Sequence, residues 1–274
     1  MRSAWLNLKK DRHFRSFFLS DNEFEKSDLQ NTRQQKWQEV QRAVRWFRLI
    51  PWISSIWVTG SLAVGNVQKN DDLDFLIITQ SHRLWLTRLV VILIGMITQK
   101  LRWHDSPKDK VQDRWCCNLW LELSNLSLHD SQNIYTAREL VQAWPVYQSS
   151  TGEAEKFVMA NTWVKHYSLL GWLTAYNRTT TLLSRPPLFS FFSVFPQVTK
   201  GLWDTFNVAA YAFQRWYMRP HQKNEKIHVS KAFFHPEDRG AIVEAEYERI
   251  VTQLRKTTYG QSPSKNNSAL SISH

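Results

Sequence analysis

The spacing of apolar residues predicts alternating helices and strands in the first half of the chain. A helical period places Val40, Val44 and Phe47 on one face of residues 28–50, and Pro51 ends that segment. Short apolar runs between polar loops predict buried strands over residues 53–59, 73–79 and 115–123. A strongly apolar segment over residues 83–101 predicts a buried helix between the second and third strands.

The second half of the chain has a helical pattern. Its predicted helices are residues 135–144, 153–181, 198–218 and 240–255. The pattern divides the chain into a core domain over 28–145, a helical domain over 146–258 and a polar tail over 259–274 that we expect to be disordered.

Candidate chemistry lies where the first strand ends and the second begins. Asp72 and Asp74 are two residues apart on a strand, so they share a face and could bridge paired divalent cations. Gly60 lets the backbone approach a phosphate, and Ser61 supplies a small hydroxyl donor. Two such acids alone are typical of a solvated edge strand, but the Gly-Ser turn and Gly65 at this spacing favour a nucleotide site.

The run Gly60 to Gly65, continued by Asp71 to Ile77, resembles the signature of the DNA polymerase β-like nucleotidyltransferase superfamily. The resemblance implies an α+β fold, with a core of a small mixed sheet and flanking helices, followed by an α-helical C-terminal region. Segments such as Cys117-Asn118, Tyr135 to Glu139 and Phe234 to Asp238 are similar to a subgroup of prokaryotic nucleotidyltransferase-domain proteins. The substrate of that subgroup is unassigned, so the resemblance implies chemistry more than substrate.

The implied reaction is transfer of a nucleoside monophosphate from a nucleoside triphosphate, with ATP the expected donor, to an acceptor hydroxyl. Pyrophosphate is released. The resemblance assigns Asp72 and Asp74 to two Mg²⁺ ions, with Mn²⁺ as an alternative metal. The expected phosphate-binding residues are Gly60, Ser61, Lys69 and Arg88.

The superfamily commonly takes a third carboxylate from a strand with an apolar-acid-apolar pattern, and Leu121-Glu122-Leu123 has that pattern. Glu122 is therefore the expected third catalytic acid and metal ligand. Strict alternation places Asn118, Trp120 and Glu122 on one face, which makes Asn118 the alternative ligand, through a neutral oxygen. A further alternative is that Glu122 only ends the strand in solvent.

One residue departs from the commoner form of the motif. Asp71 stands before the first catalytic acid, where a serine is often found. Its extra carboxylate would either repel phosphate or help to orient the metal, and the sequence leaves both open.

Composition narrows the class of partner. The 274 residues carry 35 Lys and Arg against 24 Asp and Glu, a net charge of +11, which favours a polyanion: nucleic acid, nucleotide or an acidic membrane surface. It also favours RNA or another nucleic acid as the acceptor. Most of the 14 Trp residues fall in apolar runs and are expected in the core.

Two further expectations concern the setting of the protein. The two cysteines are adjacent, which argues against a disulfide scaffold, and the N-terminal residues lack an apolar signal segment, so we expect a cytoplasmic protein. The apolar stretch 89–97 is shorter than the roughly 20 residues of a spanning helix, so no integral membrane span is expected. Rival hypotheses are a nucleotidyltransferase fold that serves as a scaffold, and a basic nucleic-acid-binding protein.

Overall fold

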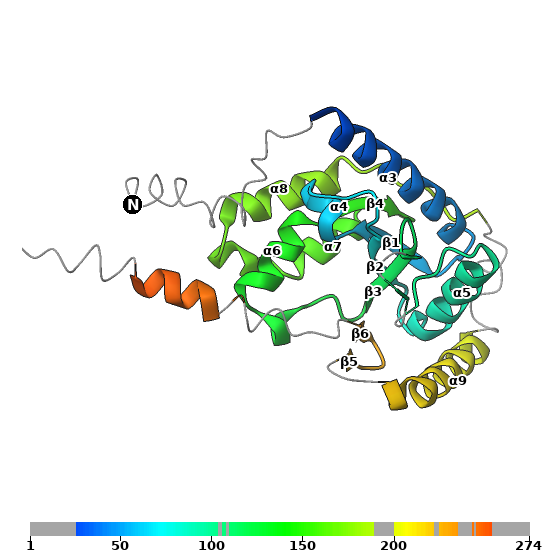
Figure 1. The fold of residues 1–274 in the computed structure, drawn as a ribbon. Helices are drawn as coiled ribbons and strands as arrows, with labels where there is room; N and C mark the ends of the chain where they lie inside the picture. The colour runs from blue at the N-terminus through cyan, green and yellow to red at the C-terminus, as the bar shows by residue number, and fades with distance from the viewer. Residues whose placement is uncertain are drawn as a thin grey trace, which may run out of the picture.

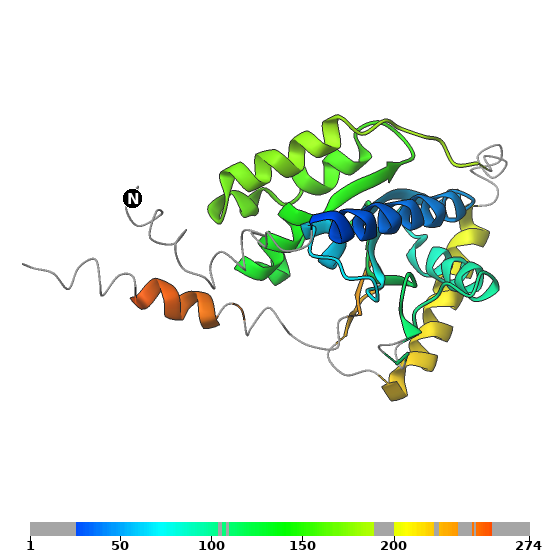
Figure 2. The same cartoon turned by 45° about the horizontal axis from the view of Figure 1, so that its top comes forward.

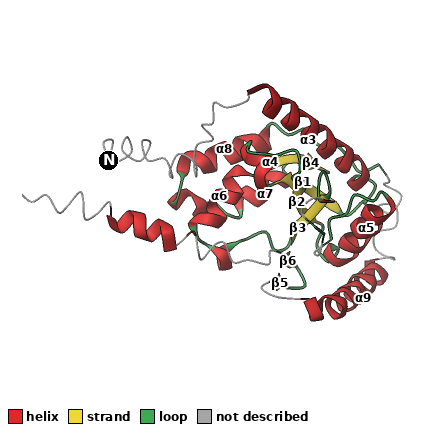
Figure 3. Cartoon of the chain, in the orientation of Figure 1, coloured by secondary structure: helices red, strands yellow, loops and turns green. Residues whose placement is uncertain are grey.

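The computed structural model describes residues 26–103, 106–107, 110–188, 200–221, 225–234, 243 and 245–253. A six-stranded mixed sheet in the order β4-β1-β2-β3-β6-β5 lies at its centre, with helices on both faces (Figure 1, Figure 3). The α+β class expected from the sequence is confirmed. The strands are β1 (Ile53–Val58), β2 (Leu73–Thr79), β3 (Trp115–Glu122), β4 (Trp144–Gln148), β5 (Lys226–Ile227) and β6 (Lys231–Phe233).

Helices precede, separate and follow these strands. They are α3 (Lys26–Phe47), α4 (Gly60–Val64), α5 (Leu84–Ile97), α6 (Ile134–Gln142), α7 (Glu153–Met159), α8 (Leu169–Thr180) and α9 (Lys200–Met218), with 3₁₀ turns η2 (His129–Ser131), η3 (Thr162–His166) and η5 (Arg219–His221). Residues 245–253 are also helical. No helix in the described part of the chain has both the length and the apolar character needed to cross a bilayer.

The three central strands confirm the sequence prediction. β1 and β2 pair antiparallel, whereas β2 and β3 pair parallel and are joined by α5. A parallel pair needs such a crossover connection, because each strand must start at the same edge of the sheet. All six residues of β1 are buried, including the two serines, Ser54 and Ser55.

Two hydrophobic cores form, one on each face of the sheet. On the face of α3 and α5, Phe47 packs edge-on against Phe75 and Trp115, with ring centroids 5.5 and 5.0 Å apart. On the face of α6, α7 and α8, Trp57 packs against Phe157 at 5.2 Å. Figure 2 shows α9 running along the outer side of α5.

The predicted helix over 135–144 is confirmed as α6, but the residues after it form a strand that the sequence did not predict. β4 pairs antiparallel with β1, with Pro145 opposite Trp57. Proline is compatible with this position because β4 lies at the edge of the sheet, where one side of the strand makes no ladder hydrogen bonds. The predicted continuous helix over 153–181 is also broken, into α7, η3 and α8.

The expectation of an all-helical C-terminal region is wrong. The helix α9 is present, but β5 and β6 follow it and form a hairpin whose second strand pairs antiparallel with β3. The sheet therefore takes strands from both sides of the predicted domain boundary at residues 145 and 146. The tail over 259–274 and the segment 235–238 lie outside the described residues.

Candidate functional site

The turn after β1 lies directly against an aspartate of β2. Gly60 has a φ of +66°, and a Cβ atom added to it would stand 2.2 Å from Oδ2 of Asp74. The backbone N–H of Thr59 donates to the carbonyl oxygen of Asp74 at 3.0 Å, which fixes the approach of the two segments. Glycine is thus required here both by the left-handed backbone and by the close carboxylate.

Asp72, Asp74 and Cys116 form the acidic cluster. One ligand atom from each lies within 4.8 Å of the others. Asp74 and Cys116 are direct neighbours across the parallel strands β2 and β3, and Asp72 immediately precedes β2. The sequence prediction that Asp72 and Asp74 lie together is borne out by this geometry.

Every member of the acidic cluster has a polar partner. Asn118 donates from Nδ2 to Oδ1 of Asp74 at 2.9 Å, and the Cys116 thiol donates to Oδ1 of Asn118 at 3.0 Å. Arg102 forms an ion pair with Asp72 through its guanidinium. Arg102 therefore supplies the positive charge beside two adjacent carboxylates in this structure.

The electrostatics of the acidic cluster favour a bound cation. The pKa of Asp74 is raised to about 7, chiefly by burial and then by the neighbouring Asp72, with a smaller contribution from Glu139 of α6, whereas Arg102 lowers it. Burial likewise raises the pKa of the Cys116 thiol, so this side chain stays protonated. A cation bound between the two carboxylates would favour the ionised form of Asp74.

The loop between α4 and β2 is anchored by Asp71. Its Oδ2 accepts a hydrogen bond from the Ser61 hydroxyl at 2.7 Å and another from the Gln68 backbone N–H at 2.9 Å. The buried Lys36 donates to the carbonyl oxygen of Asp71 and pairs with Asp113 at 2.9 Å. Asp71 thus holds Ser61 in place, and the Ser61 proton is already engaged.

Glu122, the expected third acid, is not part of the acidic cluster. Glu122 pairs with Thr79, and Thr79 is five residues along β2 from Asp74. At 3.3 Å per residue, these two positions of β2 are roughly 16 Å apart. Its buried carboxylate accepts hydrogen bonds from the Leu84 N–H at 3.3 Å and the Ser124 hydroxyl at 3.2 Å. Glu122 therefore caps the start of α5 and is neither a metal ligand here nor a solvated strand end.

A bulge in β3 explains why alternation misplaced Glu122. Cys117 pairs with Phe75 and Leu119 pairs with Leu76, so Asn118 is an extra residue in the strand. Beyond Asn118 the alternation is inverted, and Trp120 packs with Phe75 on the face opposite to Asp74. Asn118 itself reaches Asp74, but through its amide nitrogen, whereas its oxygen, the atom that a metal ligand would use, accepts from the Cys116 thiol.

Of the two expected phosphate-binding cations, Arg88 lies away from the acidic cluster. Arg88 of α5 donates to Oε1 of Gln214 and lies 4.3 Å from the centre of the Phe234 ring, and burial lowers its pKa to about 10. These contacts place Arg88 between α5, α9 and the end of the hairpin, with no contact to the acidic cluster. Lys69 is exposed on the loop before β2.

Sequence reasoning missed Arg102, Cys116 and Lys36. Lys36 had a readable signal, because it lies four residues before Val40 on the apolar stripe of α3, where a lysine needs a buried partner. Cys116, the second residue of β3, lies directly opposite Asp74, which only the strand register reveals. Arg102 lies in a basic stretch, and no local pattern distinguishes it from its neighbours.

The donor set fits one hard cation better than two. The carboxylates of Asp72 and Asp74 and the amide oxygen of Asn118 are ligands of the type that Mg²⁺ prefers. Cys116 is a softer ligand, better suited to zinc. Among the described residues, no third carboxylate belongs to the cluster.

The chain gave no significant match to any protein-family model, curated protein or solved structure. What can be inferred about function therefore rests on the motif and on the geometry of this cluster.

Proposed function

We propose that this chain is a nucleotidyltransferase of the DNA polymerase β-like type, which transfers a nucleoside monophosphate from a nucleoside triphosphate to an acceptor hydroxyl. The observation that carries the proposal is the contact between Gly60 and Asp74, with Asp72 beside it. This turn lets a backbone segment with no side chain stand next to two carboxylates, as a metal-bound triphosphate requires. ATP is the donor that we expect.

Each residue of the acidic cluster has a part in this proposal. Asp72 and Asp74 would hold the divalent cation, and Asn118, whose amide contacts Asp74, would supply a neutral oxygen after turning its amide group. A bound Mg²⁺ would neutralise charge that develops on the α-phosphate oxygens. Asp74 must give up a proton to bind the cation, since its pKa is about 7.

Arg102 has a second part. In the absence of a cation it pairs with Asp72, and a guanidinium is also a strong partner for phosphate oxygens. On binding of the metal and the triphosphate, Arg102 exchanges Asp72 for a phosphate oxygen. Gly60 provides the close approach for the same phosphates, whereas the Ser61 hydroxyl donates to Asp71 and would have to leave that partner to bind them.

A nucleotide-binding scaffold without turnover is the second candidate. It is favoured by one observation: within the described residues the cluster has two carboxylates and a protonated thiol, where the resemblance implies three carboxylates. Such a protein would bind a nucleotide and release no pyrophosphate. The third candidate, a basic nucleic-acid-binding protein, would bind independently of Asp72 and Asp74.

Isothermal titration of ATP, GTP, CTP and UTP with Mg²⁺ tests the proposal. We expect one nucleotide to bind only with the metal, and the pair Asp72→Asn and Asp74→Asn to abolish that binding while preserving side-chain volume. Glu248→Ala, which removes an exposed carboxylate from the helix over 245–253, serves as the control and should bind normally.

Two outcomes would overturn the proposal. One is absence of binding for all four nucleotides, and the other is binding that is unchanged in the paired variant. A pyrophosphate-release assay with an oligonucleotide acceptor then separates transferase from scaffold, because only the transferase releases pyrophosphate.

A further inference from the structure

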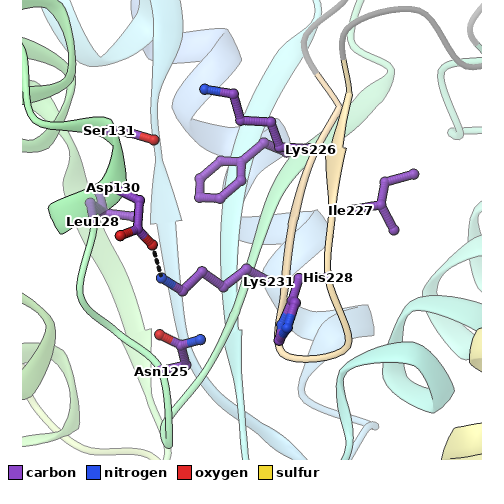
Figure 4. Close-up of a pocket in the computed structure, with 9 residues that line it drawn as sticks. Asn125, Leu128, Asp130, Ser131, Lys226, Ile227, His228 and Lys231 are labelled. Carbon is purple, nitrogen blue, oxygen red and sulfur yellow. Dashed lines mark ion pairs between the residues drawn. The ribbon is translucent and has the colours of Figure 1, made fainter.

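A cavity of about 380 Å³ lies between the β5–β6 hairpin and the loop that follows β3. Figure 4 shows the side chains of Lys226 and Lys231 extending from the hairpin towards Asp130 and Ser131 on the opposite wall. His228 stands at the turn of the hairpin, whereas Ile227 points away from the loop (Figure 4). The wall formed by the hairpin is therefore basic.

The two lysines have different surroundings. Lys231 donates to the Ser127 carbonyl oxygen at 2.8 Å and pairs with the exposed Asp130 at 3.6 Å, so it ties the hairpin to the loop. Lys226 is exposed, and its ammonium has no hydrogen bond or ion pair with the residues that the structure describes. Lys226 is thus a cation at the cavity that is available to an anion.

An aromatic ring accompanies the basic side chains. Phe233 lines the cavity and is half-buried. A π-face beside a free ammonium is the combination that binds single-stranded nucleic acid, because the ring stacks on a base while the cation pairs with a phosphate.

The cavity lies on the same face of the sheet as the acidic cluster. Phe233 pairs with Leu119, and Leu119 pairs with Leu76, two residues along β2 from Asp74. Phe233 and Leu76 both pack towards the core beneath α6 to α8, and alternation puts Asp74 on that face. Two strand spacings of about 4.8 Å and two residues along β2 separate the backbone positions of Phe233 and Asp74 by roughly 12 Å.

We propose that this cavity, the hairpin pocket, binds the phosphodiester backbone of a single-stranded nucleic acid, with Lys226 on a phosphate and Phe233 against a base. Because Phe233 and Asp74 lie on one face of the sheet, roughly 12 Å apart, the end of a strand bound there would lie near the acidic cluster, and the hairpin pocket would hold the acceptor. Its role as an acceptor site rests on the proposed transferase function, whereas its binding of the strand does not.

Fluorescence anisotropy with labelled oligo(U) and oligo(dT) of about 15 nucleotides, without metal or nucleotide, tests the binding. Lys226→Glu should weaken binding about tenfold near 0.1 M salt and lower the salt slope by roughly 0.7, the value for one phosphate contact. Lys156→Glu is the matched control, because Lys156 is equally exposed on α7 near the opposite edge of the sheet. It should leave both quantities nearly unchanged.

Phe233→Leu gives a second, independent readout. It keeps an apolar side chain in the half-buried position and removes the stacking surface, so binding should weaken about fivefold with the salt slope unchanged. An equal loss of oligonucleotide affinity in Lys226→Glu and Lys156→Glu would overturn the proposal, because it would show only a general effect of charge. Full competition by ATP or inorganic phosphate would also overturn it, since the site would then take a small anion.

The two proposals fail separately. The paired variant Asp72→Asn and Asp74→Asn should bind oligonucleotide as the wild type does. Loss of oligonucleotide binding in Lys226→Glu together with no metal-dependent nucleotide binding would retain the hairpin pocket and reject the transferase. The reverse pattern would retain the transferase and reject the pocket.

Discussion

The two ends of β3 carry polar side chains in opposite surroundings. At the first end, Cys116 and Asn118 lie beside Asp74 in a partly exposed cluster that holds an arginine. At the other end, Glu122 is buried on the opposite face and accepts the N–H of Leu84 at the start of α5. An acid at a strand end thus stabilises a helix at one position and is available to a cation at the other.

The difference is decided by what lies within hydrogen-bonding reach. The start of α5 leaves backbone N–H groups without partners inside the helix. Glu122 accepts one of them, and Asn207 of α9 accepts two more, from Trp85 and Leu86, each at 3.0 Å. At the acidic end, Gly60 adds no side chain beside Asp74, and the carboxylates of Asp74 and Asp72 are partnered by the Asn118 amide and the Arg102 guanidinium.

The largest expected effect is on stability at the buried end. Glu122→Ala should lower the free energy of unfolding by about 3 kcal/mol, because the Leu84 N–H and the Ser124 hydroxyl lose a buried acceptor. Glu122→Gln, which keeps an acceptor oxygen, should cost about 1 kcal/mol. Urea unfolding monitored by tryptophan fluorescence measures both. Loss of metal-dependent nucleotide binding in the folded Gln variant would contradict the separation of the two ends.

At the acidic end, Gly60→Ala should destabilise the protein by about 2 kcal/mol more than Gly152→Ala. Both positions have a positive φ, +66° and +83°, so both substitutions meet similar backbone strain. Only the Cβ at Gly60 meets a neighbour, the Asp74 carboxylate at 2.2 Å, whereas nothing lies within 4 Å of the Cβ at Gly152. Equal losses in the same urea experiment would show that the Gly60 turn does not press on Asp74.

The pH dependence of the free energy of unfolding should differ between the wild type and Asp74→Asn. The pKa of Asp74 is about 7 in the folded state against 3.8 for an ordinary aspartate, so between these pH values the folded state holds a proton that the unfolded state has released. The free energy of unfolding therefore falls as pH rises from 5 to 7, by about 2 kcal/mol in metal-free buffer. Asp74→Asn should remove this component. Parallel pH profiles for wild type and Asp74→Asn in EDTA would refute the raised pKa.

The smallest expected effect concerns Asp71. Asp71→Asn retains an oxygen that accepts from Ser61 and Gln68 but removes a negative charge near the expected phosphates. Nucleotide affinity should rise about threefold, since repulsion at a partly solvated site is worth roughly 0.7 kcal/mol. Titration calorimetry with the preferred nucleotide measures it. Weaker binding would mean that the carboxylate's charge orients the site, the other alternative that the sequence left open.

Local signals were sufficient for the centre of the sheet. The apolar residues 56–58 of β1 and 75–78 of β2 identify buried strands whatever their partners, and the Gly-Ser turn is followed by Asp72 and Asp74 at the spacing of the motif. The strands β4, β5 and β6 gave no comparable signal. β4 contains Pro145, and β5 and β6 have two and three residues, so they become strands only through pairing with β1 and β3.

The candidate site was predictable to the same extent. Asp72, Asp74, Gly60 and Ser61 follow from their sequence neighbours. The neighbours of Asp74 on β3 do not, because a single extra residue at Asn118 shifts the register and turns Glu122 to the other face. The sequence offered no means of locating Arg88. An arginine on α5 can face either α9 or a ligand, and its contact with Gln214 of α9 is set by how the two helices pack.

The late position of β6 in the chain sets an order of assembly. Until Lys231 to Phe233 have been synthesised, β3 has β2 on one side and an open row of N–H and C=O groups on the other. Such pairing across a long stretch of sequence is slow to form, and an open edge is where chains associate wrongly. A protein shortened before the hairpin would therefore keep the acidic cluster but expose β3, and we expect it to aggregate on refolding.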